Sequence, residues 1–385
     1  MPATLRRKSA VIAGALVLAL SAIVLLSDGS ADDRAIAETP REDRSSSSAA
    51  EATAGGSPQA TASGRRARKR KYWGAWIENA PWNMRAVRNF ERRAGKGVSI
   101  VHWGSPFADC SSRPCSFYAF PSREMTKVRR HGAIPMLSWS SASIPAGPHQ
   151  RAFQLRDVAA GRYDRHIRRF ARAAKRWGHP FFLRFNWEMN GDWFPWGVRV
   201  NRNRPRHYRR AWRHVHRIFD RVGARKATWV WCPYVDPERN FNLKRLYPGG
   251  RWVDWTCLDG YNWGPGSPAN PRPWRSFGQL FRATYLRVVR GIAPRKPMII
   301  AEIASSGYGG NKAAWIRNML AKVAHRYPRV RGLVWFNLND RNAGWAIESS
   351  RRVTRAFRRG IARPVYAPNR FRRIRRGPIR PPGGR

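Results

Sequence analysis

From Tyr72 onward, short apolar runs alternate with longer amphipathic segments along the chain. A short, continuous apolar run between segments of helical pattern is typical of a strand buried on both faces. We therefore expect eight strands, in the runs YWGAW at 72, VSIVHW at 98, AIPMLSW at 133, FFLRFNW at 181, ATWVWC at 227, WTCLDGY at 255, PMIIAEI at 297 and GLVWFN at 332.

The segments between these runs predict helices. The clearest are MRAVRNFERRAG at 84, the long stretch 151–177, HYRRAWRHVHRIFDRVG at 207 and KAAWIRNMLAKVAHRY at 312. Several of them end at Gly or are followed by Pro, the usual stop signals. Eight strands alternating with helices predict an α/β fold, a single (β/α)₈ TIM barrel over residues 72–363. An open doubly wound sheet is the alternative, but the glycine-rich phosphate loop expected after its first strand is missing from the sequence.

The ends of the chain have a different composition. Residues 1–30 combine Arg6, Arg7 and Lys8 with an apolar run, which predicts a signal peptide or an N-terminal membrane anchor. Residues 31–71 read as a low-complexity Ser/Ala-rich linker that becomes basic, and residues 364–385 as a basic, proline-containing tail. We expect the protein to be secreted, or tethered to the outer face of the membrane by an uncleaved N-terminal segment.

Export makes the four cysteines candidates for two disulfides. Cys110 and Cys115 enclose a short loop and are expected to pair, which leaves Cys232 and Cys257 as the second pair.

The ends of the predicted strands carry the candidate chemistry. In a (β/α)₈ barrel the reactive groups lie at the C-terminal ends of the strands. Glu188 follows the fourth predicted strand and Glu302 the seventh, so the two carboxyl groups are expected to face each other across the mouth. Polar and aromatic residues at other strand ends are His102, Asn186, Tyr261, Trp263 and Trp335. Two carboxyl groups among aromatic side chains are what glycosidic bond cleavage requires: one acid for the leaving oxygen and one carboxylate for the anomeric carbon.

Three stretches carry a family resemblance. LRFNWEMNGDWFPWG at 183, LDGYNWG at 258 and IIAEIASSG at 299 resemble glycoside hydrolase family 26, which comprises mostly endo-β-1,4-mannanases on a (β/α)₈ barrel. The resemblance implies that Glu188 is the acid/base, Glu302 the nucleophile and Tyr261 the partner of the nucleophile. It further implies that sugar subsites are lined by Trp193 and Trp196, together with Trp263 and Trp335.

One position departs from the family pattern. Characterised mannanases of the family have His immediately before the acid/base, whereas this chain has Trp187. We expect an exported retaining β-glycosidase, most similar to an endo-β-1,4-mannanase, with β-1,3-xylan and mixed-linkage β-glucan as alternative substrates. A non-catalytic glycan-binding or wall-binding protein on a degenerate barrel is the alternative from another class.

Other chemistries have little support in the sequence. His214 and His216 point to different faces of one helix, and no HExxH, GxSxG or P-loop sequence occurs, so we expect neither a metal nor a cofactor. The net charge is +51, and most of it falls within residues 72–363. This charge predicts nonspecific attraction to anionic cell-wall polymers. A polysaccharide substrate, a monomer and no specific nucleic-acid partner are expected.

Overall fold

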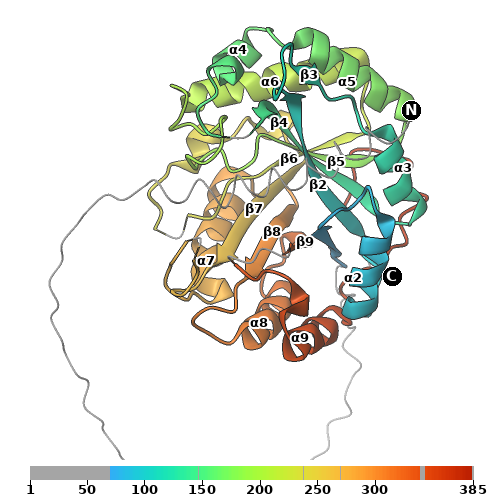
Figure 1. Cartoon of the computed structure of the whole chain (residues 1–385), viewed down its shortest axis with the longest axis vertical. Helices are drawn as coiled ribbons and strands as arrows, with labels where there is room; N and C mark the ends of the chain where they lie inside the picture. Colours follow the sequence, from blue (N-terminus) through green and yellow to red (C-terminus); the bar gives the residue numbers. More distant parts are fainter. Residues whose placement is uncertain (1–69, 146, 237, 269, 339–342, 384–385) are drawn as a thin grey trace, which may run out of the picture.

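A closed parallel barrel forms the centre of the molecule. The computed structural model describes residues 70–145, 147–236, 238–268, 270–338 and 343–383. Within these residues the strands pair in the order β1, β9, β8, β7, β6, β5, β4, β2, and β1 also pairs with β2, which closes the barrel (Figure 1). The barrel strands are β1 Tyr72–Ile77, β2 Ile100–Asp109, β4 Ile134–Ile144, β5 Phe181–Phe185, β6 Ala227–Trp231, β7 Trp255–Asn262, β8 Met298–Ser305 and β9 Val330–Asn337. The predicted (β/α)₈ barrel is confirmed, and the open sheet is excluded.

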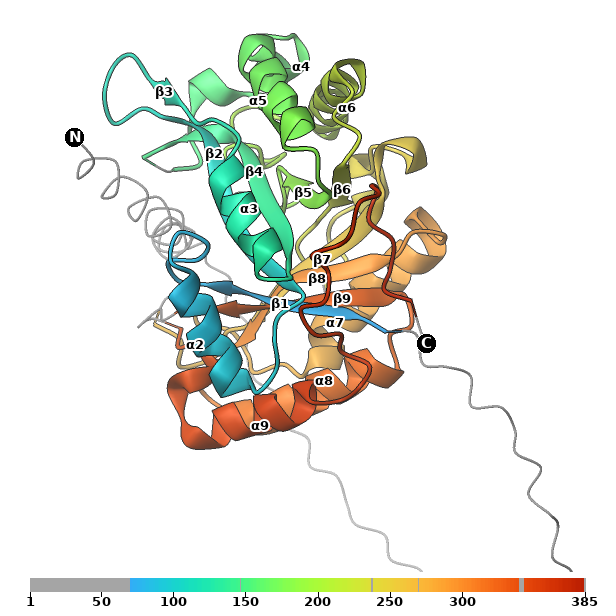
Figure 2. The same ribbon diagram turned by 90° about the vertical axis from the view of Figure 1, so that its right-hand side faces the viewer.

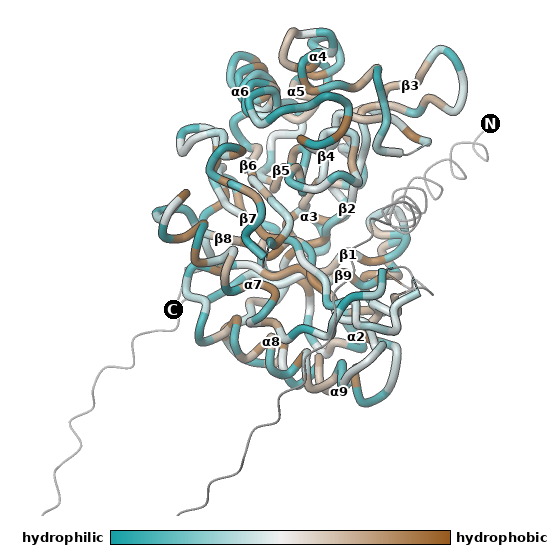
Figure 3. Tube along the Cα trace, turned by 90° about the vertical axis from the view of Figure 1, so that its left-hand side faces the viewer, coloured by the Kyte–Doolittle hydropathy of each residue, from teal (hydrophilic) through white to brown (hydrophobic). Residues whose placement is uncertain are grey.

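Helices surround the strands. They are α2 Met84–Ala94, α3 Ser122–Arg130, α4 Leu155–Ala159, α5 Asp164–Trp177, α6 Pro205–Val222, α7 Phe277–Leu286, α8 Lys312–His325 and α9 Arg351–Ile361. Shorter helical turns are η2 Arg151–Phe153, η3 Leu243–Leu246, η4 Gly250–Trp252, η5 Arg287–Ile292 and η6 Ile347–Ser349. Each long helix turns an apolar stripe inward: α5 buries Ile167, Phe170 and Ala174, while most of its arginines are exposed. Figure 3 shows the resulting hydrophilic colours on α6.

The stretch 151–177, expected as one long helix, is divided into η2, α4 and α5. Gly161 lies between α4 and α5 with φ +91°, a left-handed backbone that a right-handed helix cannot contain. The break turns the chain so that α5 can pack beside α6.

Both expected disulfides are present. Cys110–Cys115 closes the loop between β2 and the short strand β3 Ser116–Phe117, which pairs antiparallel with the end of β2. Cys232–Cys257 joins the end of β6 to β7 inside the barrel.

The segment after residue 363, which its composition describes as a basic, proline-containing tail, packs against the barrel. Tyr366 and Ile379 are buried, and Phe371 packs edge-on against Tyr72 with ring centroids 4.9 Å apart. The indole of Trp255 donates a hydrogen bond of 2.8 Å to the Ile379 carbonyl. Figure 2 shows this red segment running beside β7, β8 and β9.

The start of the described chain lies against the same segment. Lys71, placed by its composition in the linker, is buried and forms a parallel bridge with Tyr366. Lys71 and residues 364–383 together cover the N-terminal ends of the barrel strands. We call this covered end of the barrel the floor. This packing could not be predicted from the composition, because the segment is rich in Arg and Pro and its buried residues are few and widely spaced.

The proposed signal or anchor, residues 1–30, and nearly all of the proposed linker lie outside the described residues. Within the described ranges, none of the helices has the length and apolar character needed to cross a membrane.

Candidate active site

A cleft of about 500 Å³ opens at the C-terminal ends of the barrel strands. Its walls come from the loops that follow β5, β6 and β7, as the barrel architecture predicts. Glu188 lines the cleft together with the aromatic side chains Trp193, Tyr234, Tyr261 and Trp263.

Glu188 stands in the loop after β5, in a backbone conformation that is uncommon for a residue with a side chain. Its φ is +52°, and its amide donates a 2.7 Å hydrogen bond to the Cys232 carbonyl. Such strained residues persist where the surroundings fix them, and they are frequent at functional sites. Gly191 follows in a tight turn, where a Cβ atom would lie 2.4 Å from the indole of Trp193. The turn therefore places the Trp193 ring beside Glu188.

The Glu188 carboxyl is only 2% exposed, and it accepts a 2.6 Å hydrogen bond from Nε1 of Trp193. Burial, and then the negative charge of Glu302, raise the pKa of Glu188 to about 8. The positive charge of Arg184 opposes this shift without cancelling it. Glu188 is therefore mainly protonated at neutral pH and able to act as an acid.

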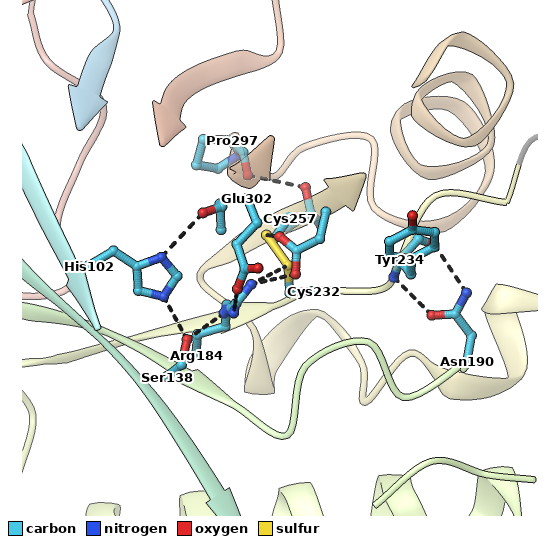
Figure 4. The surroundings of a disulfide bond; sticks show 12 residues. His102, Ser138, Arg184, Asn190, Cys232, Tyr234, Cys257, Pro297 and Glu302 are labelled. Carbon is cyan, nitrogen blue, oxygen red and sulfur yellow. Dashed lines mark hydrogen bonds and ion pairs between the residues drawn. A yellow bond between two sulfur atoms is a disulfide. The ribbon is translucent and has the colours of Figure 1, made fainter. Parts of the chain in front are cut away.

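Glu302 lies within β8 and has a different set of neighbours. Its carboxylate forms an ion pair with the Arg184 guanidinium (Figure 4). It also accepts a hydrogen bond from the Tyr261 hydroxyl. Both donors are buried, so their interaction with the carboxylate is little weakened by water. Arg184 and Tyr261 thus fix the orientation of the Glu302 carboxylate, whereas Glu188 lies in surroundings that favour its protonated form.

Arg184 is the centre of this arrangement, and the sequence analysis did not place it in the site. It comes from β5, is fully buried, and also forms an ion pair with Asp259 of β7. Burial raises the pKa of Asp259 well above its usual range, and the charges of Glu302 and Glu188 add to the rise, although Arg184 opposes it. The Arg184 guanidinium therefore forms ion pairs with Glu302 and Asp259, and its positive charge also acts on Glu188. The signal for it was a lone Arg in an otherwise apolar strand, FFLRF.

His102 and Ser138 hold Arg184 in place through a chain of hydrogen bonds. The Ser138 hydroxyl accepts a 2.7 Å hydrogen bond from Nε of Arg184 and lies 2.6 Å from Nε2 of His102. The other ring nitrogen of His102 lies 3.2 Å from the Ala301 carbonyl. Burial lowers the pKa of His102 well below its usual value, so the ring is neutral, with its proton on Nδ1 facing the carbonyl. His102 thus positions Arg184 and does not line the cleft.

Aromatic side chains form the walls near the two carboxyl groups. The rings of Tyr261 and Trp263 lie 5.9 Å apart, and Trp345 packs against both, at 5.2 and 4.8 Å. On the other side Trp193 contacts Tyr234 at 5.2 Å. Trp345 is buried behind these rings and does not line the cleft. Tyr234 was missed because it follows β6 at a distance that the pattern of apolar runs does not fix.

Besides His102, three of the expected site residues do not line the cleft. Trp335 faces the helix layer, 5.5 Å from Phe357 of α9, because alternate residues of a strand point to opposite faces. Trp196 is buried inside the loop after β5, stacked on Phe194 at 4.4 Å. Asn186 hydrogen-bonds the amide and the hydroxyl of Ser141 and ties this loop to β4. These residues shape the loop and the barrel without lining the cleft.

Trp187, the residue that departs from the family pattern, is buried between two neighbours. Its ring lies 4.8 Å from that of Trp196, and the Arg184 guanidinium sits over it at 4.7 Å. It therefore packs on the cation that holds Glu302.

One group of three potential metal ligands occurs among the described residues, Cys232, Cys257 and Asp259. The two sulfur atoms are bonded to each other, and Asp259 is paired with Arg184, so this group does not provide a metal site.

Comparisons with known proteins agree with this geometry. A model of glycosyl hydrolase family 26 matches residues 126–318. Endoglucanase H of Acetivibrio thermocellus is 33% identical over 303 residues, which are 75% of this chain and 30% of that protein. Mannan endo-1,4-beta-mannosidase A and B of Caldalkalibacillus mannanilyticus is 29% identical over 172 residues, or 43% of this chain and 28% of that protein. The chain thus spans less than a third of the length of these two relatives.

Among solved structures, the catalytic domain of an endo-β-1,4-mannanase from Bacillus sp. JAMB-750 is similar with a TM-score of 0.57. The match covers 80% of this chain and 92% of that one at 16% sequence identity. At this identity the likeness concerns the fold alone.

Proposed function

The chain belongs to glycosyl hydrolase family 26, and from this premise we propose that it is an exported enzyme that hydrolyses a β-glycan with retention of anomeric configuration. The observation that carries the proposal is the contrast between Glu188, which lines the cleft, and Glu302 of β8, whose charge acts on Glu188. Glu188 has a pKa raised to about 8, whereas Glu302 is paired with Arg184 and Tyr261. Two titratable groups whose surroundings separate their protonation states are the usual basis of an acid and nucleophile pair.

In the first step, Glu188 donates its proton to the glycosidic oxygen while the Glu302 carboxylate attacks the anomeric carbon. The C–O bond to the leaving sugar breaks, and a covalent glycosyl–enzyme ester forms. In the second step the Glu188 carboxylate takes a proton from water, and the resulting hydroxide oxygen displaces Glu302 from the same carbon. Both groups then return to their starting protonation states.

The neighbours of Glu302 have defined tasks in this scheme. Tyr261 and Arg184 orient the attacking oxygen of Glu302. They also stabilise the partial negative charge that remains on the Glu302 carboxyl group while the ester forms. The rings of Tyr261 and Trp263 provide apolar faces for a sugar and exclude water from the reacting carbon, and the buried Trp345 packs against both rings.

The proposed substrate is a β-1,4-mannan, attacked within the chain. A β-glucan is the second candidate. It is supported by the similarity to an endoglucanase, because that match covers more of this chain than the match to the mannosidase. Trp187 stands where characterised mannanases of the family have His, which also supports a substrate other than mannan.

A sugar-release assay tests the proposal. Purified protein is incubated with β-1,4-mannan, mixed-linkage β-glucan and β-1,3-xylan, with the Glu302→Ala variant as control. Release from one polymer by the wild type, at least several hundredfold above the variant, is expected. NMR of the first product should show the β anomer. Binding without release by both proteins would support the alternative of a binding protein, and an α product would overturn the role of Glu302.

Export is proposed from residues 1–30 alone. Recovery of the protein from the culture medium, with its N-terminus determined by mass spectrometry, distinguishes a cleaved signal peptide from a retained anchor.

A further inference from the structure

A second, larger hollow lies beside the cleft at the same end of the barrel. It has a volume of about 1320 Å³ and is lined by segments that follow β2, β4 and β5. The loop after β5 separates the two hollows: Trp193 and Arg199 line the cleft, whereas Asn201 and Arg202 line the second hollow. We call this second hollow the arginine groove. In Figure 2 the β3 segment projects from the barrel on this side, near α4 and α5.

The lining of the arginine groove is strongly basic. It contains no Asp or Glu, and it includes the exposed residues Arg113, Arg151, Arg156, Arg162, Arg202 and His149. Arg156 and Arg162 share one half-buried carboxylate, that of Asp157, at 3.9 and 3.8 Å. Within the described part of the chain, Arg113, Arg151 and Arg202 have no hydrogen-bond or ion-pair partner from their side chains. Three guanidinium groups are therefore free to bind an anion.

An aromatic surface lies among these charges. Phe117, on β3, is 40% exposed, the one large apolar side chain so exposed in the described residues. Its ring lies 4.9 Å from the ring of His166 and 6.2 Å from that of Tyr163, and Tyr163 stacks on Phe153 at 5.3 Å. The Cys110–Cys115 disulfide closes the loop next to Phe117 and also lines the groove. The disulfide therefore restricts the motion of the loop next to the Phe117 ring.

We propose that the arginine groove is a binding site for a polysaccharide that carries carboxylate groups. Guanidinium groups bind planar carboxylates through two parallel hydrogen bonds, and an exposed aromatic ring packs against the apolar face of a sugar. A glycan is favoured over a nucleic acid because the groove opens beside the proposed glycan cleft, so a polymer network that holds the substrate reaches both. This last step rests on the proposed function, whereas the chemistry of the groove does not.

Binding of polygalacturonate tests the proposal without using catalysis. The variant Arg113→Gln/Arg151→Gln/Arg202→Gln removes the three unpaired charges. The matched control Arg352→Gln/Arg355→Gln/Arg359→Gln removes three exposed charges from α9, which does not line the groove. At about 0.15 M salt the dissociation constant should rise about tenfold for the groove variant and less than twofold for the control.

Phe117→Ala should weaken polygalacturonate binding without changing its dependence on salt, since no charge is removed. Equal losses for the two triple variants would show that overall charge alone attracts the polymer, and the proposal would be wrong. Single-stranded DNA that binds as tightly as polygalacturonate, with the same loss in the groove variant, would likewise overturn the choice of a glycan. Circular dichroism confirms that each variant is folded.

Two further measurements separate this proposal from the proposed function. The groove variant should cleave a neutral β-glycan at the wild-type rate, and Glu302→Ala should bind polygalacturonate as the wild type does. If no β-glycan is cleaved, the binding experiment still decides whether the arginine groove is a site.

Discussion

The indole nitrogen of Trp193 lies 2.6 Å from Oε2 of Glu188, so one side chain both forms a wall of the cleft and donates a hydrogen bond to the proposed acid. The donor stabilises the charged form of Glu188 and lowers its pKa, which burial and Glu302 raise. The pKa of about 8 is the balance of these effects. It follows that the wall of the cleft helps to set the pH range in which the acid is protonated.

For the wild type we expect kcat/KM to fall as the pH rises through about 8, because Glu188 must carry a proton to act as an acid. The Trp193→Phe variant keeps an aromatic wall and loses the N–H donor. Its Glu188 should have a higher pKa, so the alkaline limb should move up by about 0.5 to 1 pH unit. A pH profile of kcat/KM on a soluble oligosaccharide measures the shift. A limb that moves to lower pH, or no limb near 8 in the wild type, would contradict the assignment of Glu188.

Glu188→Ala should separate the two chemical steps. Cleavage of the natural glycan should fall by about 10² to 10⁴, the usual contribution of a general acid. An aryl glycoside with a good leaving group needs no proton, so it should still form the glycosyl–enzyme ester. Added azide should then attack that ester and give a glycosyl azide of β configuration, detected by NMR. Glu302→Ala is the control: it forms no ester, so any azide product must arise by direct attack on the substrate and should have the α configuration.

Arg184→Met should destabilise the fold, because it leaves the carboxyl groups of Asp259 and Glu302 buried without their cation. Removing one partner of a buried ion pair typically costs about 3 to 5 kcal/mol. Urea unfolding followed by tryptophan fluorescence measures this loss. A carboxyl group whose pKa is higher in the folded state binds its proton more tightly there, so folded stability decreases as the pH rises. The deficit of the variant should therefore be largest at pH 8 and smaller near pH 5. A deficit independent of pH would show that lost packing, and not charge, is responsible.

Ending the chain at Arg363 should lower the unfolding temperature strongly or prevent folding. The deletion removes Tyr366 and Ile379 and exposes the surface of the barrel that they cover. It also removes the carbonyl that accepts the hydrogen bond of the Trp255 indole. Burial of one such side chain contributes about 1.5 to 3 kcal/mol, against a typical total stability of about 5 to 15 kcal/mol. Ile379→Ala is a milder test, with an expected loss of about 2 to 4 kcal/mol in urea unfolding. A deletion variant as stable as the full chain would show that this packing contributes nothing to stability.

Removing residues 1–64 should leave folding and sugar release unchanged. Arg331 hydrogen-bonds the Arg70 carbonyl, and Lys71 is the first buried residue of the described chain. The measurement is activity and unfolding temperature beside those of the full chain. Loss of either would show that the preceding segment belongs to the folded unit.

The sequence predicted those features that depend on short-range pattern. Each barrel strand is buried on both faces, so its apolar run is visible in the chain, and the strand-end rule then placed Glu188 and Glu302 at the mouth. The direction of each side chain was not predicted. Trp335 and Phe336 are neighbours in β9, yet Phe336 contacts Tyr261 at 5.4 Å whereas Trp335 contacts α9. Attention to the alternation along the strand would have assigned Trp335 to the outside.

Features set by long-range packing were out of reach. The pairing of Arg184 with Asp259 and Glu302 joins β5, β7 and β8, and nothing in the order of residues states which carboxyl groups meet which cation. The packing of residues 364–383 on the floor depends on the shape of a surface that forms only when the barrel closes.

The floor gives the molecule a direction. The described chain begins and ends there: Arg331 bonds the carbonyls of Arg70 and Pro382, while the cleft and the arginine groove open at the opposite end of the barrel. Whatever holds the protein through either terminus, whether a membrane, a wall or a fused module, attaches to the face turned away from both openings. The point of attachment on the folded body therefore covers neither opening.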